Sequence, residues 1–327
     1  MKTIILLAIV IIALTSCNKI ERINVNETKN KVESTEEDDK SVEESSIEKE
    51  VEKTTEEKDI ESSDKEIGEN LKSAVLLNPD GQTIEERYNP PEGFKRVQVE
   101  PGSYQEFLRK QKLKPYGSKA LYHDGREKKK DYVYDSVLDV ETGPRDLHQC
   151  ADAIMLLRAE YLYANERYDD IKFHFVSGFL TEYSKWIEGY RIDPDIGYYP
   201  AGIPGDTSYE SFREYMDMVF AYAGTLSMLN EAKPISPDNM KIGDIFLDKG
   251  HTVIIMDIAE NAEGKKMFMV AQSYMPAQQT QILKNQNNPE ISPWYSLDSV
   301  VKDKVILTPE WKFNLSDLME YNGAVED

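Results

Sequence analysis

Apolar and polar positions divide this chain into three parts. Residues 1–17 have a basic start followed by an apolar run, and residues 18–72 contain few apolar side chains. Regular hydrophobic patterning begins at about Ser73, and the roughly 250 residues that follow are enough for one sizeable core. We therefore expect a signal peptide over 1–17, a disordered acidic tether over 18–72 and a single domain over 73–327.

Helical periodicity is clearest at two places within the domain. Leu147, Ala151 and Ile154 lie at helical spacing and predict a helix that runs to about residue 165. A longer amphipathic stretch over 208–229 predicts a second helix. A shorter helix is expected over 103–110, because Ser103 with Glu106 three residues later forms a capping-box pattern.

Short apolar runs that suit strands dominate the later part of the domain. Three of them follow one another over 242–247, 252–258 and 267–272, and tight polar turns separate them. Consecutive short strands with such turns are typical of an antiparallel meander. Strands are also expected over 94–99 and 132–140, and a loop rich in Pro, Gly and Tyr over 193–206.

The charge of the chain is concentrated in the tether. The whole sequence has a net charge of −21, and residues 27–70 alone hold 18 acidic residues against seven lysines. No basic patch is present, so we expect no nucleic-acid partner. The run Lys128-Lys129-Lys130 is interpreted as a solvated loop.

The end of the apolar start resembles a processing signal. Leu14-Thr15-Ser16-Cys17 is similar to the lipobox of bacterial lipoproteins, in which the cysteine becomes the lipidated first residue. The resemblance implies lipidation of Cys17, attachment to a membrane through that lipid, and a place in the bacterial cell envelope outside the cytoplasm. The alternative is an ordinary signal peptide in which the cysteine occurs by chance.

Cys150 is the other cysteine of the chain, and Cys17 is assigned to lipid. Asp146 as N-cap, with Gln149 three residues later, would place Cys150 in the first turn of its helix. Unpaired N–H groups and the helix dipole favour an anion there, so the thiol should ionise more easily and act as a nucleophile. The alternative is a small residue packed in the core.

Four histidines could act as its base, and His251 is the best placed of them. It lies between Gly250 and a β-branched run, where a strand edge can hold the ring. His148 is only two residues from Cys150, and side chains at that spacing on a helix diverge. No spacing of cysteine and histidine fits a metal site, so we predict no metal and no cofactor.

The order of these features resembles the core of papain-like thiol hydrolases of the NlpC and CHAP type. A Gly243-Asp244 turn opens one strand, His251 begins the next, and Gln272 lies on the strand after that. The resemblance implies an α+β fold in which helices pack on a small antiparallel sheet, with the nucleophile at a helix N-terminus. It also implies that Cys150 is the nucleophile, that His251 is the base and that Gln272 orients the imidazole.

A thiol nucleophile at a helix start also needs groups that stabilise the developing oxyanion. The backbone N–H of Cys150 would be one donor to a developing oxyanion, and His148 or Gln149 could supply a second. The strand alternation places Gln272 nearly opposite His251, so its amide oxygen should approach a ring nitrogen. These residues together predict a thiol hydrolase that cleaves an amide, and the envelope location points to a cell-wall peptide.

Three segments resemble a second group, a family of uncharacterised bacterial lipoproteins. They are RDLHQCADAIMLLRAEYLY, GHTVIIMD and VAQSYMPAQQ, and the resemblance extends over residues 89–311 without implying an activity. Two further functions therefore stay open. One is a non-catalytic lipoprotein that binds glycan, peptide or protein, with Cys150 in the core. The other is transglutaminase-like acyl transfer, in which Asp257 would be the third residue.

Overall fold

The computed structural model describes residues 76–324. The expected signal peptide, the Cys17 lipidation site and the acidic tether lie outside the described residues. No helix within residues 76–324 is long and apolar enough to cross a membrane.

Two helices of the described chain are longer than ten residues. They are α4 (Cys150–Ala164) and α6 (Tyr209–Tyr222). The shorter helices are α2 (Ile84–Arg87), α3 (Tyr104–Arg109), α5 (Tyr183–Ile187), α7 (Thr225–Glu231) and α8 (Leu297–Asp303). Single 3₁₀ turns are η1 (Tyr168–Asp170), η2 (Pro237–Asn239), η3 (Pro289–Ile291) and η4 (Leu315–Asp317).

A nine-stranded sheet forms the centre of the structure, and all its pairings are antiparallel. Its main order is β2-β11-β10-β9-β8-β15-β7, with β1 on β9 and β12 on β10. The strands are β1 (Phe94–Arg96), β2 (Tyr134–Val137), β7 (Lys233–Pro234), β8 (Ile245–Leu247), β9 (Thr252–Asn261), β10 (Lys266–Gln272), β11 (Gln281–Leu283), β12 (Tyr295–Ser296) and β15 (Leu318–Glu320). Three separate hairpins are β3 (Lys172–His174) with β4 (Leu180–Glu182), β5 (Tyr190–Asp193) with β6 (Gly197–Pro200), and β13 (Val305–Leu307) with β14 (Lys312–Asn314).

This architecture shows that the expected papain-like fold, with helices packed on a small sheet, is wrong. The structure is mostly an antiparallel sheet of nine strands, with few helices. The predicted meander is present as β8, β9 and β10, but six further strands extend it. Two of the six, β1 and β2, lie within the strands expected over 94–99 and 132–140. The other four are only two or three residues long and carry no readable alternation, so the sequence pattern does not reveal the full sheet.

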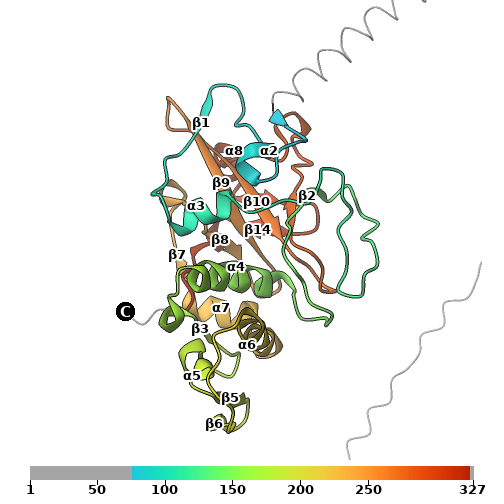
Figure 1. Cartoon of the computed structure of the whole chain (residues 1–327). Coiled ribbons are helices and arrows are strands. Elements are labelled where there is room, and N and C mark those ends of the chain that lie inside the picture. Colours follow the sequence, from blue (N-terminus) through green and yellow to red (C-terminus); the bar gives the residue numbers. More distant parts are fainter. Residues whose placement is uncertain (1–75, 325–327) are drawn as a thin grey trace, which may run out of the picture. The chain divides into compact units, whose positions relative to one another are not determined.

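The helix α4 lies across this sheet. Figure 1 shows it between the sheet and a group formed by α5, α6 and the β5–β6 hairpin. Ten of its 15 residues are buried, including all eight of residues 150–157. A helix that is apolar on nearly all sides is typical of such an interior position. The helix therefore packs against β9 and β10 of the sheet on one side and against α6 on the other.

Two arginines attach peripheral elements to the middle of β9 through one buried carboxylate. Arg96 on β1 and Arg109 on α3 lie 2.6 and 2.8 Å from the two carboxylate oxygens of Asp257. Asp257 is fully buried. Buried carboxylates need such partners, because an unpaired charge in the interior is very costly.

The expected helix over 208–229 is divided in two. It ends at Tyr222, and α7 restarts at Thr225 after Gly224, whose extended backbone (φ 167°) cannot continue a helix. The expected loop over 193–206 contains the second strand of the β5–β6 hairpin. The short helix over 103–110 is confirmed, because Ser103 accepts a hydrogen bond from the N–H of Glu106.

Candidate active site

The helix α4 begins at Cys150 itself. Its N-cap is Gln149 and not the expected Asp146. The carboxylate of Asp152 accepts the N–H of Gln149 at 3.0 Å, while Asp146 accepts the N–H of Ala277 at 2.6 Å in a neighbouring loop. Asp146 therefore binds the Ala277 loop and does not cap α4, and the helix starts later than expected. Cys150 becomes the first helical residue, where backbone N–H groups have no partner within the helix.

The Cys150 thiol lies among backbone N–H groups, and the residue is only 6% exposed. Burial and, to a lesser degree, the charge of Asp152 raise its pKa to about 11. The N–H groups of Ala151, Thr252 and Cys150 act in the opposite direction. The expectation that the helix start makes this thiol easier to ionise is thus wrong, because desolvation exceeds the effect of the N–H groups. Since Thr252 follows His251, the sulfur adjoins the peptide that leads from the histidine into β9.

His251 is held in place by its backbone and by aromatic rings. Its N–H donates to the carboxylate of Asp248 at 2.9 Å. The ring centroid lies 4.8 Å from Tyr274, 5.3 Å from Trp311 and 5.7 Å from Phe313. Burial lowers the pKa of His251 to about 4, with a smaller opposite effect from Gln272. The imidazole is therefore neutral at pH 7.

Gln272 contacts the ring of His251. The His251 Nε2 atom is 2.8 Å from Gln272 Oε1, and both residues are buried. The strand register explains the approach: Ala271 pairs with Ile254, so the next pair brings Gln272 opposite Val253. Val253 and His251 share one face of the chain, since they are two residues apart. The predicted contact between these two side chains is present.

A buried ion pair lies behind Gln272. Its Nε2 donates to Glu310 Oε2 at 2.9 Å, and Lys128 Nζ lies 2.6 Å from the same oxygen. The side chains of Lys128 and Glu310 are 1% and 7% exposed. The expectation that Lys128 lies in a solvated loop is therefore wrong. A lysine run usually marks a surface, and no local pattern distinguishes the one member that folds inward.

The β13–β14 hairpin carries Glu310 to this position. In its turn, Thr308 accepts the N–H of Trp311 at 3.1 Å. Trp311 also donates its indole N–H to Asp248 at 2.9 Å, so the hairpin closes over the histidine. No sequence pattern indicates that Glu310 or Lys128 belongs to this site. They are about 180 residues apart, and only the fold brings them together.

The other candidate residues take separate positions. His148 is buried, with Nε2 3.1 Å from the Thr280 hydroxyl, and burial lowers its pKa to about 3. Gln149 lines the same hollow as Cys150. Asp257, the third residue of the acyl-transfer alternative, forms ion pairs with Arg96 and Arg109, and no hydrogen bond joins it to His251 within residues 76–324.

The thiol borders a hollow of about 210 Å³. Apolar side chains of Leu147, Phe220 and Met275 line part of it, and Asp152 lines another part. Burial raises the pKa of Asp152 to about 8, and its Oδ1 has no hydrogen-bond partner among the described residues. Gly250, the residue before His251, also lines this hollow, whereas His251 and Gln272 do not. A thiol that borders a cavity and lies next to the peptide of a neutral histidine suits attack on a carbonyl group.

No group of three or more His, Cys, Asp or Glu side chains within residues 76–324 is arranged to hold a metal ion.

Comparison with known proteins gives a family. The model of DUF4846, a domain of unknown function, matches residues 84–320. No curated protein and no solved structure is significantly similar to the chain.

Proposed function

We propose that this chain, which belongs to the DUF4846 family, is a thiol hydrolase that cleaves an amide bond with Cys150 as its nucleophile. His251 is the base and Gln272 orients it. The observation that carries the proposal is the 2.8 Å contact between His251 Nε2 and Gln272 Oε1, beside the helix that begins at Cys150. A third polar residue on a catalytic histidine fixes the tautomer and the orientation of the ring.

The network behind Gln272 selects one tautomer of His251. A carboxylate only accepts hydrogen bonds, so Glu310 requires the NH₂ group of Gln272 to face it. The amide oxygen then faces His251, which must carry its proton on Nε2. The nitrogen left with a lone pair is Nδ1. The ion pair with Lys128 at 2.6 Å stabilises Glu310 as a carboxylate, and this supports the orientation of the Gln272 amide.

The reaction starts from a neutral pair. With pKa values of about 11 for the thiol and about 4 for the imidazole, a preformed thiolate–imidazolium pair is not the resting state. In the proposed first step, Nδ1 takes the thiol proton while the sulfur forms a bond to the substrate carbonyl carbon. Collapse of the tetrahedral intermediate breaks the C–N bond, and the imidazolium gives its proton to the leaving amine.

Water completes the proposed cycle. It attacks the thioester with His251 again as base, the carboxylic acid leaves, and the thiol is restored. The N–H of Cys150, which has no partner within α4, is the first donor to the oxyanion. Gln149 is the second, because it lines the hollow and His148 does not. The side-chain NH₂ of Gln149 donates one hydrogen to Asp146 at 3.3 Å and keeps a second hydrogen for the oxyanion.

The proposed substrate is a peptide of the cell wall. Lipidation at Cys17 would place the enzyme in the bacterial cell envelope, outside the cytoplasm, and the acidic segment over 18–72 would separate the domain from the membrane. The partly apolar hollow of about 210 Å³ has room for one small side chain beside the thiol. The partners of the protein are then the membrane and the wall peptide.

The experiment is digestion of purified wall peptides by full-length protein in detergent, followed by mass spectrometry. We expect a defined amide cleavage that Cys150→Ala abolishes. The matched control is Cys17→Ala, which removes the proposed lipidation site and should retain cleavage while losing membrane attachment. Absence of cleavage, or cleavage that survives Cys150→Ala, contradicts the proposal.

One observation favours a second function. Burial of Cys150 and the resulting pKa of about 11 are also typical of a packed, inert thiol. On this alternative the protein binds a wall glycan, peptide or protein without cleaving it. Stoichiometric binding of wall fragments, unchanged in Cys150→Ala and without any turnover, is its signature.

A further inference from the structure

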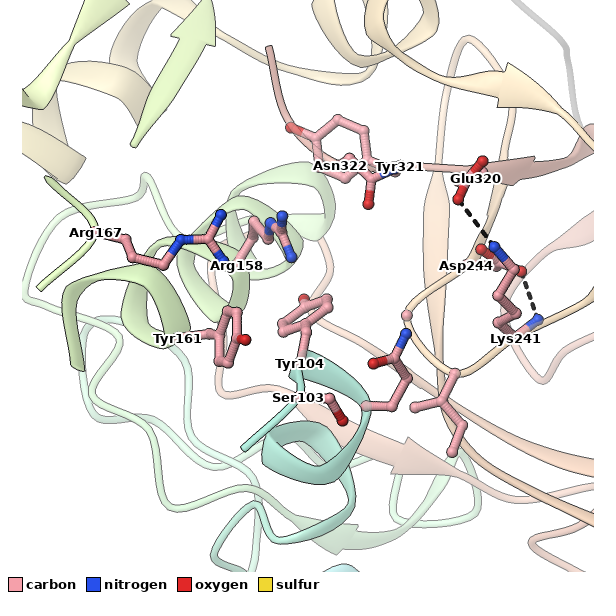
Figure 2. Close-up of a pocket in the computed structure, with 13 residues that line it drawn as sticks. Ser103, Tyr104, Arg158, Tyr161, Arg167, Lys241, Asp244, Glu320, Tyr321 and Asn322 are labelled. Atoms are coloured by element: carbon pink, nitrogen blue, oxygen red, sulfur yellow. Dashed lines mark hydrogen bonds and ion pairs between the residues drawn. The ribbon is translucent and has the colours of Figure 1, made fainter. Parts of the chain in front are cut away.

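A second cavity lies farther along α4. Its volume is about 230 Å³, and Arg158 and Tyr161 of α4 form one side of it (Figure 2). None of its lining residues lines the hollow at Cys150. Arg158 follows Cys150 by eight residues, which corresponds to roughly 12 Å along the helix axis. This cavity is therefore separate from the proposed active site.

Arg158 is held by aromatic rings and by no acidic group. Its guanidinium carbon lies 4.9 Å from the ring centroid of Tyr104 and 5.7 Å from that of Tyr161. It forms no hydrogen bond and no ion pair with any residue in the described range, and its buried Nε is without a partner there. A cation in this state has donors to offer to a ligand.

The other two cations of the cavity already have partners. Arg167 donates to Asp170 at 2.7 Å, and Lys241 lies 3.1 Å from the carboxylate of Glu320. Arg158 is thus the positive charge of this cavity that no described acidic residue matches. A guanidinium presents a planar fork of N–H donors, which fits the two oxygens of a carboxylate or a phosphate.

The opposite side of the cavity favours a ligand of low charge. Figure 2 shows Asp244 and Glu320 across from Arg158. Burial raises the pKa of Asp244 to about 7, so this group is partly ionised at neutral pH, while Glu320 is paired with Lys241. The remaining negative charge on Asp244 would repel a doubly charged phosphate more strongly than a single carboxylate. Gln105, which also lines the cavity, makes no side-chain hydrogen bond to other residues in 76–324 and adds a neutral donor and acceptor.

We propose that this cavity binds a small organic carboxylate, whose two oxygens accept hydrogen bonds from the guanidinium group of Arg158. Tyr104 and Tyr161 keep the guanidinium group in position through their ring contacts. The site goes beyond the proposed hydrolysis and does not depend on any chemistry at Cys150.

The test is calorimetric titration of the full-length protein in detergent with acetate, propionate and succinate. Inorganic phosphate and methylamine are the comparison ligands. We expect at least one carboxylate to bind with one-to-one stoichiometry. Arg158→Met should abolish this binding, and Arg158→Lys should weaken it about tenfold, because an ammonium keeps the charge but loses the fork. Arg126→Met is the matched control and should leave the affinity unchanged, since Arg126 lies outside the cavity and pairs with Asp124 at the surface.

A second measurement needs no variant that could misfold. In the wild-type protein, the NMR resonance of the Arg158 Nε–H should shift on addition of the carboxylate. The proposal is overturned if no carboxylate binds or shifts this resonance. It is also overturned if binding is unchanged in Arg158→Met, or if phosphate binds more tightly than every carboxylate.

Discussion

His251 Nε2 lies 2.8 Å from Gln272 Oε1, and Glu310 accepts the other end of the same amide at 2.9 Å. Because the Glu310 carboxylate only accepts hydrogen bonds, it turns the NH₂ group of Gln272 toward itself. The amide oxygen of Gln272 then faces His251 and favours a proton on Nε2. The buried Lys128 lies 2.6 Å from Glu310. The four side chains form a row in the order Lys128, Glu310, Gln272 and His251. Glu310 therefore favours one tautomer of the proposed base without touching it, through the Gln272 amide that does.

Replacement of Glu310 by glutamine should disturb that pattern. The introduced amide can both donate and accept, so the Gln272 amide is free to turn and the two neutral tautomers of His251 should mix. Nitrogen-15 NMR of the imidazole measures this directly, with Nε2 protonated in the wild type. Glu263→Gln, at a surface ion pair with Lys265, is the control and should leave the spectrum unchanged. If His251 in Glu310→Gln still carries its proton on Nε2 alone, Glu310 does not select the tautomer.

The charge of Asp152 should influence the thiol. Burial is the main reason for the Cys150 pKa of about 11, and Asp152 adds to it, so Asp152→Asn should lower this pKa. Iodoacetamide alkylation from pH 7 to 11 checks the shift, in a Cys17→Ala background where Cys150 is the remaining thiol. Asp146→Asn alters a carboxylate of the same hollow and is the matched control. Coincident profiles for Asp152→Asn and its parent would contradict the expected coupling.

The same carboxyl group should make stability depend on pH. Its pKa is about 8 in the folded protein and 3.8 as the ordinary value, so between these values the folded state keeps a proton that the unfolded state has lost. Stability from this group therefore falls as the pH rises from 4 to 8. Urea unfolding at pH 5 and pH 8 should show a larger loss in the wild type than in Asp152→Asn. If the free energy of unfolding falls equally between pH 5 and pH 8 in both proteins, Asp152 is not the cause of the pH dependence.

Loss of the buried carboxylate on β9 should destabilise the fold strongly. Asp257→Asn leaves Arg96 and Arg109 without their shared partner, and breaking such a buried pair costs about 3–5 kcal/mol. Chemical denaturation measures the difference. Asp131→Asn removes an exposed partner of Lys119 and should leave the free energy of unfolding nearly unchanged. Similar small effects at both sites would show that the interior pairs contribute little.

The sequence predicted the local elements better than the architecture. The meander over 242–272 and the helix that carries Cys150 were predictable because their apolar runs are long enough to show a period. The nine-stranded sheet was not, since strands such as β12 and β7 contain two residues each. Their assignment depends on pairing with strands far along the chain.

The candidate site divides in the same way. The contact of His251 with Gln272 could be predicted, because both lie at the adjoining ends of one hairpin. Glu310 and Lys128 could not, because a turn and a loop deliver them from distant parts of the domain. The thiol pKa was predicted with the wrong sign, because the sequence shows the helix start and not the depth of burial that outweighs it.

The central claim is that Cys150 attacks a carbonyl group with the help of His251. The most direct measurement is mass spectrometry of full-length Cys17→Ala protein after brief reaction with p-nitrophenyl acetate, with peptide mapping of the acylated residue. We predict a single acetyl group on Cys150, lost in Cys150→Ala and formed much more slowly in His251→Ala. A protein that stays unacylated at Cys150, or that is acylated equally fast without His251, would contradict the account.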